Sequence, residues 1–461
     1  MEFNLVDTPD KYWEAHNTLW GKPRLAADTE TSVREEWRGK RVSALNVHVS
    51  QIEITALKAD DTAPYVIDHR ILREVYGFEP PLADLFDSVG YLLGANFKFD
   101  LKFFYALLGK WFANARDVIL MARMISNATG SKFGAMHGHG LADLVRDLLN
   151  IHLSGKGSDL QGSDWGLPVV QRRVDNDYWI RKLTYAAGDT EYLFPLEDRM
   201  YPVINNTLPR TDLIPDGTDD WDNFGLSMGG QFQLEMETLP VTAMMEYNGV
   251  PASKEILTSL QRALTDRLEE LAYSLAQYFQ LPVDQSEDIF SASYVASEKA
   301  KKTLNDPNKL LKFIKGNLNL YNLDNTQTAV LERSLELLDK VGIEKKGPAD
   351  DREQTKAEAI EIITEEESDL YKQLDNLEAS MIFETTPVLK KIVEYRRLKK
   401  LEGMDMRKYI NPATDRIHAN MNQIGTATSR FSCNSPNLQQ VGTKTSLPVP
   451  VKIDENGVIQ R

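Results

Sequence analysis

Acidic side chains at three places in the N-terminal half have types and spacings that suit a metal-dependent catalytic site. Asp28 and Glu30 stand two residues apart, so a strand would place both carboxylates on one face. Asp100 comes at a predicted turn from a strand into a helix, a common position for site residues in α/β sheets. Tyr185 and Asp189 are four residues apart, which puts a phenol and a carboxylate on one helix face.

Carboxylates that converge on one site require neutralisation. Two of them repel by about 4 kcal/mol at about 4 Å in an effective dielectric of about 20. Protons or cations must therefore compensate the charge, and ligands that are all oxygen favour Mg²⁺ or Mn²⁺. Two such ions about 4 Å apart stabilise the attacking and leaving oxygens of an in-line phosphoryl displacement. A phenol within hydrogen-bond distance can orient or deprotonate the attacking water.

Other catalytic motifs are missing from the sequence. Gly155-Lys156 is no P-loop, because Asn150 occupies the position where the loop needs its first glycine. The histidines have no zincin spacing, and the single cysteine cannot build a thiolate zinc site. His137 and His139, near a helix start, are interpreted as structural residues.

Hydrophobic periodicity predicts the elements that position the acidic residues. Strand-like and helix-like patterns alternate through the first 205 residues, and periodicity is then lost over 206–232, which indicates a linker or a large surface loop. Strands are predicted at 24–27, in alternating stretches across 45–54, at 65–67 and at 91–95, and helices at 99–109, 141–149 and 178–194, the last ended or bent by Pro195. Further helices are predicted at 254–280, 295–315, 326–341 and 355–404, with a C-cap at Asn248-Gly249, a strand-like pattern at 416–422 and an exposed strand and turn at 451–458.

The composition is that of a globular protein of roughly two to four domains, with 461 residues, 42% hydrophobic and 26% charged. Cys433 has no cysteine partner, which favours a reducing compartment. The first residues lack the pattern of a signal peptide, and no run approaches the roughly 18 apolar residues of a membrane helix. We therefore expect a cytoplasmic protein, in a bacterium or a phage-infected host, without a membrane partner.

The net charge of −15 does not exclude a nucleic-acid partner, because the charge is unevenly distributed. An acidic run at 350–369 is interpreted as a solvated helix face. A basic run at 390–408 is a candidate for nucleic-acid contact, and its basic residues are Lys390, Lys391, Arg396, Arg397, Lys399, Lys400, Arg407 and Lys408.

Together, the three acidic strings closely resemble the 3′–5′ exonucleases of the DEDD superfamily, in the subgroup that contains a tyrosine. The matching strings are Asp28-Thr29-Glu30-Thr31, Asn96 to Asp100, and Tyr185 to Asp189. The resemblance implies a ribonuclease-H-like α/β domain over 1–205, a mixed sheet flanked by helices. It implies that Asp28, Glu30, Asp100 and Asp189 hold two Mg²⁺ or Mn²⁺ ions and that Tyr185 positions the water. Glu30 and Thr31 would lie beside the terminal nucleotide, and Asn96 and Phe99 would line the path of the strand.

The second half is similar to family A DNA polymerases. The similarity is carried by Glu237 to Val241, Met245 to Val250, Ile392 to Leu401, Thr426 to Cys433, and Pro436 to Val441. The string from Thr426 is the most specific, with Ser429 where Gly is usual and Cys433 where Ser is usual. The resemblance implies a mainly α thumb and the start of the palm over 233–410, and a partial α+β palm over 411–461. Contacts with primer–template duplex are expected from Arg396, Lys399, Lys400, Arg430, Asn437 and Gln440, with Arg430 in the minor groove at the primer terminus.

Several polymerase residues of that family cannot be placed in the sequence. These are the first catalytic Asp on an apolar strand, the fingers helix with its Lys and Tyr, and a later His-Asp pair; Asp454 is not set in such a strand. We therefore expect the proofreading 3′–5′ exonuclease and DNA-binding portion of a split family A DNA polymerase. It would release nucleoside monophosphates from single-stranded DNA 3′ ends. A second polypeptide would carry the fingers and the remaining palm.

Two alternatives stay open. One is a non-catalytic DNA clamp or processivity module with a vestigial exonuclease site, which the presence of all five site residues disfavours. The other is a self-sufficient exonuclease whose polymerase remnant only grips the duplex. The sequence does not separate this last reading from a split polymerase, or a natural split from a truncation.

Overall fold

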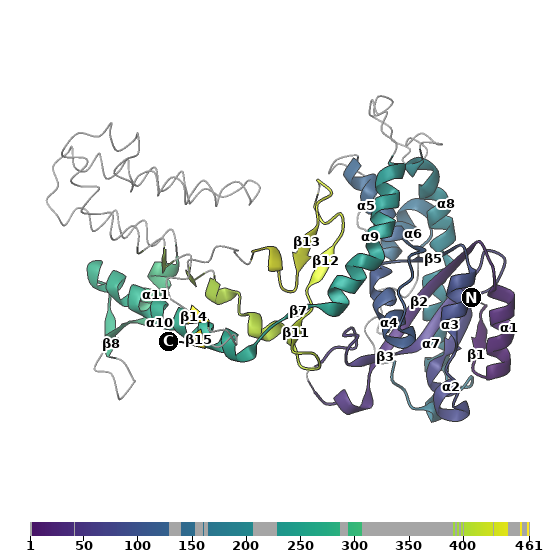
Figure 1. Cartoon of the computed structure of the whole chain (residues 1–461), viewed down its shortest axis with the longest axis horizontal. Helices are drawn as coiled ribbons and strands as arrows, with labels where there is room; N and C mark the ends of the chain where they lie inside the picture. Colours follow the sequence, from purple (N-terminus) through teal and green to yellow (C-terminus); the bar gives the residue numbers. More distant parts are fainter. Residues whose placement is uncertain are drawn as a thin grey trace. The chain divides into compact units, whose positions relative to one another are not determined.

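The chain forms two compact units in the computed structural model (Figure 1). Unit 1 comprises Met1–Ala252 with Tyr409–Thr443, and unit 2 comprises Ser253–Lys408 with Lys444–Arg461. The structure describes residues 2–40, 42–128, 140–152, 160, 165–205, 228–285, 294–306, 391, 394–395, 398–399, 401–426, 428–440, 452–453 and 459–460. Outside these lie the predicted helix at 326–341, the acidic run, most of the predicted helix at 355–404, and His137 and His139.

A six-stranded mixed sheet forms the centre of unit 1. Its order is β1-β4-β3-β2-β5-β6, with β3 antiparallel to both neighbours and the other pairs parallel. The strands are β1 Asn4–Val6, β2 Arg24–Val33, β3 Ser50–Lys58, β4 Tyr65–Asp68, β5 Tyr91–Gly94 and β6 Ala115–Asp117. The predicted strands at 24–27, 65–67 and 91–95 are thus confirmed, whereas the alternating residues at 45–49 form turns.

The first strand is longer than its apolar run predicts. The sequence predicts a strand at 24–27, which would leave Asp28 and Glu30 at its end, but β2 continues to Val33. The parallel partner β5 pairs only as far as Ala26, and beyond that point β2 pairs with β3 alone. Pairing with β3 extends β2 through its polar half. Because the pairing with β5 ends at Ala26, the two carboxylates lie just beyond the carboxyl end of β5.

Helices cover both faces of this sheet. They are α1 Pro9–Leu19, α2 His69–Tyr76, α3 Leu82–Ser88, α4 Lys98–Leu108, α5 Val118–Ala128, α6 Leu141–Leu149, α7 Asp177–Glu191, α8 Leu193–Ile204 and α9 Gly229–Asn248, with short 3₁₀ turns at Glu35–Trp37 and Val169–Gln171. Helix α7 packs on β2 and β3 through a small core that includes Ile54 and Trp179, while a larger core that includes Leu25, Ile52 and Phe104 fills the space under the other helices.

Several helix boundaries follow the predicted signals. Gly109 and Gly249 end α4 and α9 with positive φ, which glycine adopts without steric cost. The helix expected over 178–194 instead divides at Tyr192, and Pro195 lies in the first turn of α8, where its missing N–H is not needed. The predicted linker ends earlier than residue 232, because α9 begins at Gly229.

Residues from three parts of the sequence complete unit 1. Strands β7 Val250–Pro251, β11 Arg416–Ile417 and β10 Ile410–Asn411 form a three-stranded sheet, and β12 Asn420–Asn422 pairs with β13 Ser432–Asn434. A 3₁₀ turn at Leu438–Gln440 follows. The strand expected over 416–422 is therefore two short strands of different sheets. The domain boundaries predicted at 205, 232 and 410 also differ from those of the two units. Helix α9 and the 409–440 segment pack with the first 205 residues.

Unit 2 is mainly helical in its described part. Helix α10 Lys254–Tyr278 begins at Ser253, whose hydroxyl accepts a hydrogen bond from the N–H of Ile256. The leucines of α10 pack against α11 and against Tyr395 and Leu398. The other elements are β8 Val283–Gln285, β9 Tyr294–Ala296, α11 Glu298–Asn305, a 3₁₀ turn Met406–Tyr409 at the border of the units, and the pair β14 Lys452–Ile453 and β15 Ile459–Gln460.

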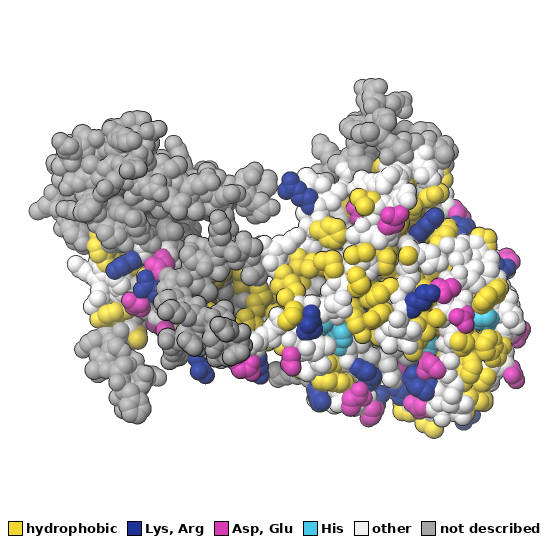
Figure 2. Space-filling view, viewed as in Figure 1, with side chains coloured by type: hydrophobic (Ala, Val, Ile, Leu, Met, Phe, Trp, Pro, Cys, Tyr) yellow, Lys and Arg dark blue, Asp and Glu magenta, His cyan; other side chains and the backbone are white. Residues whose placement is uncertain are grey.

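Two surface properties bear on function. Among the described residues, the helices lack any stretch of the length and hydropathy that crossing a bilayer requires. On the visible face of the described part, Lys and Arg side chains are interspersed with Asp and Glu and form no single basic patch (Figure 2).

Candidate active site

Three carboxylates meet where β2 faces α7. Asp28 and Glu30 lie on one face of β2, and Asp189 lies on α7, which packs on that strand. One ligand oxygen from each carboxylate lies within 4.8 Å of the other two. Asp189 is buried, and the other two are half-buried. Because like charges this close repel, protons or a cation must compensate them, and the group could hold a cation such as Mg²⁺ or Mn²⁺, which an all-oxygen set suits.

Asp100 reaches the same stretch of β2 from the first turn of α4. Its Oδ1 atom accepts hydrogen bonds from the N–H and the hydroxyl of Thr29, at 2.9 and 2.6 Å. Burial raises the pKa of Asp100 to about 7, although the Thr29 hydrogen bonds act in the opposite direction. Asp100 is therefore held next to the residue between Asp28 and Glu30, and it is not one of the three carboxylates that meet within 4.8 Å.

Tyr185 lies one helical turn before Asp189 on α7. Its hydroxyl is hydrogen-bonded to Asp189, and its ring lies 6.4 Å from that of Trp165. Burial, followed by the negative charges of Asp189, Glu30 and Asp28, raises the pKa of Tyr185 far above its usual value. The structure thus brings the predicted phenol beside the three carboxylates and favours its neutral form.

Asp117 is a supporting residue that the sequence reasoning missed. It ends β6, is buried, and its carboxylate accepts hydrogen bonds from the N–H groups of Asn96, Phe97 and Ile119, at 3.2, 2.8 and 2.7 Å. These bonds hold the turn that leads into α4 and hence place Asp100. The available signal was an Asp directly before an apolar helical segment, which is a typical N-cap pattern.

The other residues expected near the terminal nucleotide occupy varied environments. Thr31 is buried, and its hydroxyl donates to the carbonyl of Ala44 at 2.8 Å. Asn96 is exposed and has a φ of 55°, in the left-handed region. Phe99 is half-buried, with its ring 4.9 Å from that of Phe103.

The residues expected to contact duplex DNA lie in both units. Arg430 is exposed, in a tight turn where its N–H donates to the Thr426 hydroxyl at 3.0 Å. Ser429, just before it, has a φ of 58°, a conformation that favours glycine. Asn437 Oδ1 accepts from the N–H of Gln439. Only the backbone of Gln440 is described, Arg396 and Lys400 lie outside the described residues, and Lys399 forms an exposed ion pair with Glu402.

A buried ionic cluster joins the helix of Asp100 to the strands near Arg430. The Glu246 carboxylate on α9 lies 2.6 Å from both Lys98 and Lys102 of α4, and it also accepts from the N–H of Met421 at 2.6 Å. Lys98 donates to Asn420 as well. The nuclease-like sheet and the β12–β13 pair are therefore fastened together inside unit 1.

Two family models and several curated proteins match this chain. A family model described as 3′–5′ exonuclease matches residues 3–205, and a second, described as DNA polymerase family A, matches residues 297–453. DNA polymerase I of Aquifex aeolicus is 24% identical over 448 residues, which are 96% of this chain and 58% of that protein. The thermostable DNA polymerase I of Thermus aquaticus is 40% identical over 67 residues, 14% of this chain and 8% of that protein.

Solved structures with low sequence identity also match the chain. The POL domain of Pol1 from M. smegmatis, in complex with DNA primer-template and dNTP, matches with a TM-score of 0.52 and 14% identity over 96% of this chain and 57% of that chain. NrnC of Brucella melitensis bound to pGG matches with a TM-score of 0.37 and 17% identity over 54% of this chain and 95% of that chain.

The fold and the acidic cluster together define a nuclease domain of the α/β type joined to further polymerase-like elements. The chain carries a 3′–5′ exonuclease domain in residues 3–205 and a segment of the DNA polymerase family A in residues 297–453. It spans 58% of the length of the Aquifex relative and 8% of the Thermus relative.

Proposed function

We propose that this chain is a divalent-metal-dependent 3′–5′ exonuclease that trims DNA 3′ ends and proofreads for a family A DNA polymerase. The observation that carries the proposal is the meeting of ligand oxygens from Asp28, Glu30 and Asp189 within 4.8 Å. The hydroxyl of Tyr185 is bonded to one of them. The exonuclease family model supports the proposal, because its match over residues 3–205 contains every residue of this cluster.

The donor set fits Mg²⁺ or Mn²⁺, since every available ligand atom is a carboxylate oxygen and no thiolate or imidazole belongs to the cluster among the described residues. Asp28, Glu30 and Asp189 would hold the ions, and Asp100 would complete the set from α4. When bound, two ions would supply charge stabilisation for the attacking and leaving oxygens of the phosphodiester.

The protein's own groups would fix the geometry of hydrolysis. Tyr185 would orient the attacking water through its hydroxyl. Without bound ions, burial and the neighbouring carboxylates raise the pKa of this phenol, so the hydroxyl keeps its proton and is available as a hydrogen-bonding group. Thr29 and Asp117 would keep Asp100 in place, one at the carboxylate and the other at the turn before α4.

The test is hydrolysis of 5′-labelled single-stranded DNA with Mg²⁺ or Mn²⁺. Asp28→Ala with Glu30→Ala should reduce 3′-end trimming to the background rate, while circular dichroism shows an intact fold. Asp10→Ala with Glu14→Ala, which removes two exposed carboxylates of α1, is the matched control and should leave the rate unchanged. Undiminished hydrolysis in the first double variant would exclude this site as the nuclease centre.

We also propose that the chain binds primer–template duplex through Arg430, Asn437 and the basic run. The exposure of Arg430 supports this, as does the ionic cluster of Glu246, which ties the β12–β13 pair to the nuclease sheet. Phosphate contacts release counterions, so affinity should fall steeply with salt. Lys399→Ala with Lys400→Ala should flatten the plot of log affinity against log salt, while Lys11→Ala with Lys110→Ala should not. If Lys399→Ala with Lys400→Ala leaves the wild-type slope unchanged, the basic run is a solvated helix face that does not contact DNA.

For DNA synthesis, we propose that the fingers and the remaining palm pack against unit 1 near the β12–β13 pair and the exposed side chain of Phe431. They cannot extend the sheet at Arg416–Ile417, because β11 already has β10 and β7 on its two sides. The 461 residues by themselves should not extend a primer, and adding the fingers and the remaining palm should restore incorporation. Extension by these residues alone would refute the proposal.

A further inference from the structure

An irregularity in the central sheet lies opposite one of the candidate metal ligands. Glu30 pairs with Ile54 across the sheet, but the next residue, Thr31, pairs with Ile52. Glu53 is therefore an extra residue in β3, a β-bulge. Such bulges increase the local twist and change the direction of nearby side chains.

The two isoleucines confirm the effect of the extra residue. In a regular strand, Ile52 and Ile54 would share a face, as their alternation predicts. In the structure, Ile54 lies opposite Glu30 and Ile52 lies opposite Thr31, and because Glu30 and Thr31 are consecutive, the two isoleucines point to opposite faces of the sheet. Ile54 accordingly packs in the small core with Trp165, and Ile52 does not. The alternation of side chains between the two faces of β3 is therefore shifted by one residue at Glu53. This shift lies next to Glu30 on the neighbouring strand β2.

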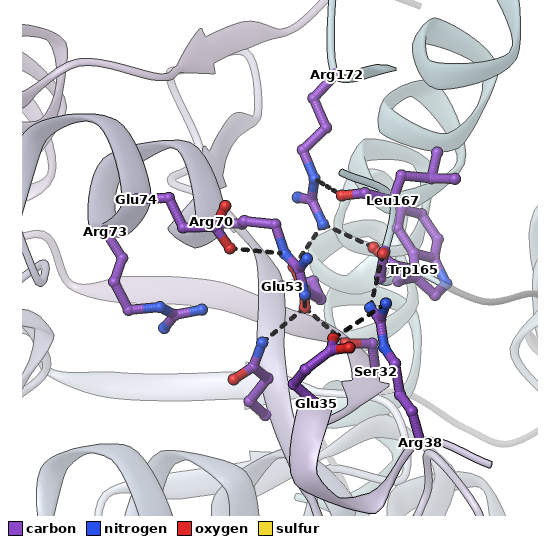
Figure 3. A network of polar contacts seen from close by, with 12 residues as sticks. Ser32, Glu35, Arg38, Glu53, Arg70, Arg73, Glu74, Trp165, Leu167 and Arg172 are labelled. Carbon is purple, nitrogen blue, oxygen red and sulfur yellow. Dashed lines mark hydrogen bonds and ion pairs between the residues drawn. The ribbon is translucent and has the colours of Figure 1, made fainter. Parts of the chain in front are cut away.

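A buried ionic network holds Glu53 in this position (Figure 3). Its Oε1 atom accepts from Arg70 at 2.7 Å and from the hydroxyl of Ser32 at 2.6 Å, and its Oε2 atom accepts from both Arg70 and Arg172. The Glu53 and Arg172 side chains are fully buried. Burial raises the pKa of Glu53, but the hydrogen bonds of Arg70 and the charge of Arg172 outweigh it and keep the pKa below its usual value.

The same network reaches the tyrosine side of the site. Arg172 donates to the carbonyls of Trp165 and Leu167, both at 2.7 Å, and so fixes the segment before α7. The Trp165 ring in turn lies against Tyr185. Glu53 and Arg172 do not belong to the acidic cluster. They hold the bulge opposite Glu30 and the Trp165 segment beside Tyr185.

We propose that Glu53 is a positioning residue that, through the bulge, aims the Glu30 carboxylate at the divalent cation. This rests on the proposed function, because it takes the acidic cluster as the metal site. Glu53→Gln keeps the size of the side chain but removes the charge that anchors the two arginines, so the bulge should loosen and Glu30 should lose its fixed direction. Changes in the groups that orient metal ligands typically lower metal affinity by about 10- to 100-fold.

The experiment measures Mn²⁺ binding directly, by electron paramagnetic resonance titration of the full chain, without DNA. Glu53→Gln should weaken Mn²⁺ binding roughly tenfold. The matched control is Glu197→Gln, since Glu197 is an equally buried carboxylate that pairs with Arg24 and Arg116 beside the amino end of β5. Both variants should lower the melting temperature, but only Glu53→Gln should change Mn²⁺ affinity. Unchanged affinity in folded Glu53→Gln, or an equal loss in Glu197→Gln, would overturn the proposal.

A milder variant keeps the test decisive if Glu53→Gln does not fold. Ser32→Ala removes only the hydroxyl that binds Glu53 from β2, and it should weaken Mn²⁺ binding by a smaller factor; no change would count against the proposal. Hydrolysis by the wild-type chain, assayed separately, tests the exonuclease function. A chain that binds Mn²⁺ in a Glu53-dependent way but does not cut DNA would refute that function and leave the role of Glu53 standing.

Discussion

The Asp100 carboxylate accepts two hydrogen bonds from a single residue, Thr29, which stands between Asp28 and Glu30 on β2. The backbone N–H and the hydroxyl of Thr29 bind the same oxygen atom. Helix α4 is thereby attached to the strand at the position that separates the two strand carboxylates. The relative placement of three candidate metal ligands therefore depends on one threonine.

Thr29→Val should show how much the hydroxyl bond to Asp100 contributes to stability. Valine has nearly the same shape but no hydroxyl, so Asp100 would keep the N–H bond and lose the 2.6 Å bond. We expect a loss of about 1–3 kcal/mol in the free energy of unfolding, the range for a hydrogen bond to a buried or charged group, measured by urea denaturation. Thr18→Val, which removes a hydroxyl that only bonds within α1, is the control and should change stability much less. Equal losses of unfolding free energy in the two variants would show that the hydroxyl bond to Asp100 stabilises the fold no more than a bond within α1.

Tyr185→Phe should slow hydrolysis less than the loss of a metal ligand. The variant removes the hydroxyl that is bonded to Asp189 but leaves all the carboxylates in place. Positioned proton-handling groups typically contribute about 10²- to 10⁴-fold, and a group that only orients water should lie at the low end. The measurement is single-turnover trimming of labelled DNA, with Tyr178→Phe on the same helix as control. A rate as low as that of Asp28→Ala with Glu30→Ala would assign Tyr185 a larger role.

Glu246→Ala should strongly destabilise unit 1. It leaves Lys98 and Lys102 without their shared carboxylate, in side chains that are only 11% and 17% exposed. Breaking a buried ion pair typically costs about 3–5 kcal/mol, because a charge remains uncompensated. The exposed pair of Lys110 and Asp87 provides the control, and Asp87→Ala should cost less than about 1 kcal/mol. Equal shifts of the two urea midpoints would contradict a buried anchor.

Acid should weaken the junction between the loop of His48 and the segment of His418. The two rings lie 4.3 Å apart, and each donates to a backbone carbonyl of α9. Burial and the neighbouring His418 lower the pKa of His48 to about 4, and burial also lowers that of His418. Between about pH 6.5 and 4, the unfolded chain therefore binds more protons than the folded chain. The stabilising contribution of the two neutral histidines is fully present above about pH 6.5 and is lost as the pH falls towards 4.

The loss for His48 between pH 7 and 5 should be on the order of 1 kcal/mol, since the residue is only half-buried. His48→Gln keeps a donor for the carbonyl of Tyr247 but does not titrate, so its stability should depend less on pH in this range. His152→Gln replaces an exposed histidine and should keep the wild-type slope. Identical slopes in thermal unfolding of wild type and His48→Gln from pH 7 to 5 would contradict the expectation.

Local patterns in the sequence carried much of this protein's organisation. The spacing of Tyr185 and Asp189 follows from helical geometry alone, and the glycines that end α4 and α9 act through their own backbone freedom. Apolar runs located most strands of the sheet. Such features involve residues within about one helical turn or one strand, so neighbouring residues suffice to predict them.

Contacts between distant residues decided the rest. Asp117 supports a turn some twenty residues earlier, Glu53 in the bulge is paired with Arg70 and Arg172, and Glu246 is held by lysines of another helix. None of these partners is close in sequence, so no periodicity marks them. The sequence by itself determined which residue types could hold a metal ion and on which elements they lie. The tertiary structure alone decided that three carboxylates meet while Asp100 binds Thr29, because hydrogen-bond directions at a site depend on how β2, α4 and α7 pack together.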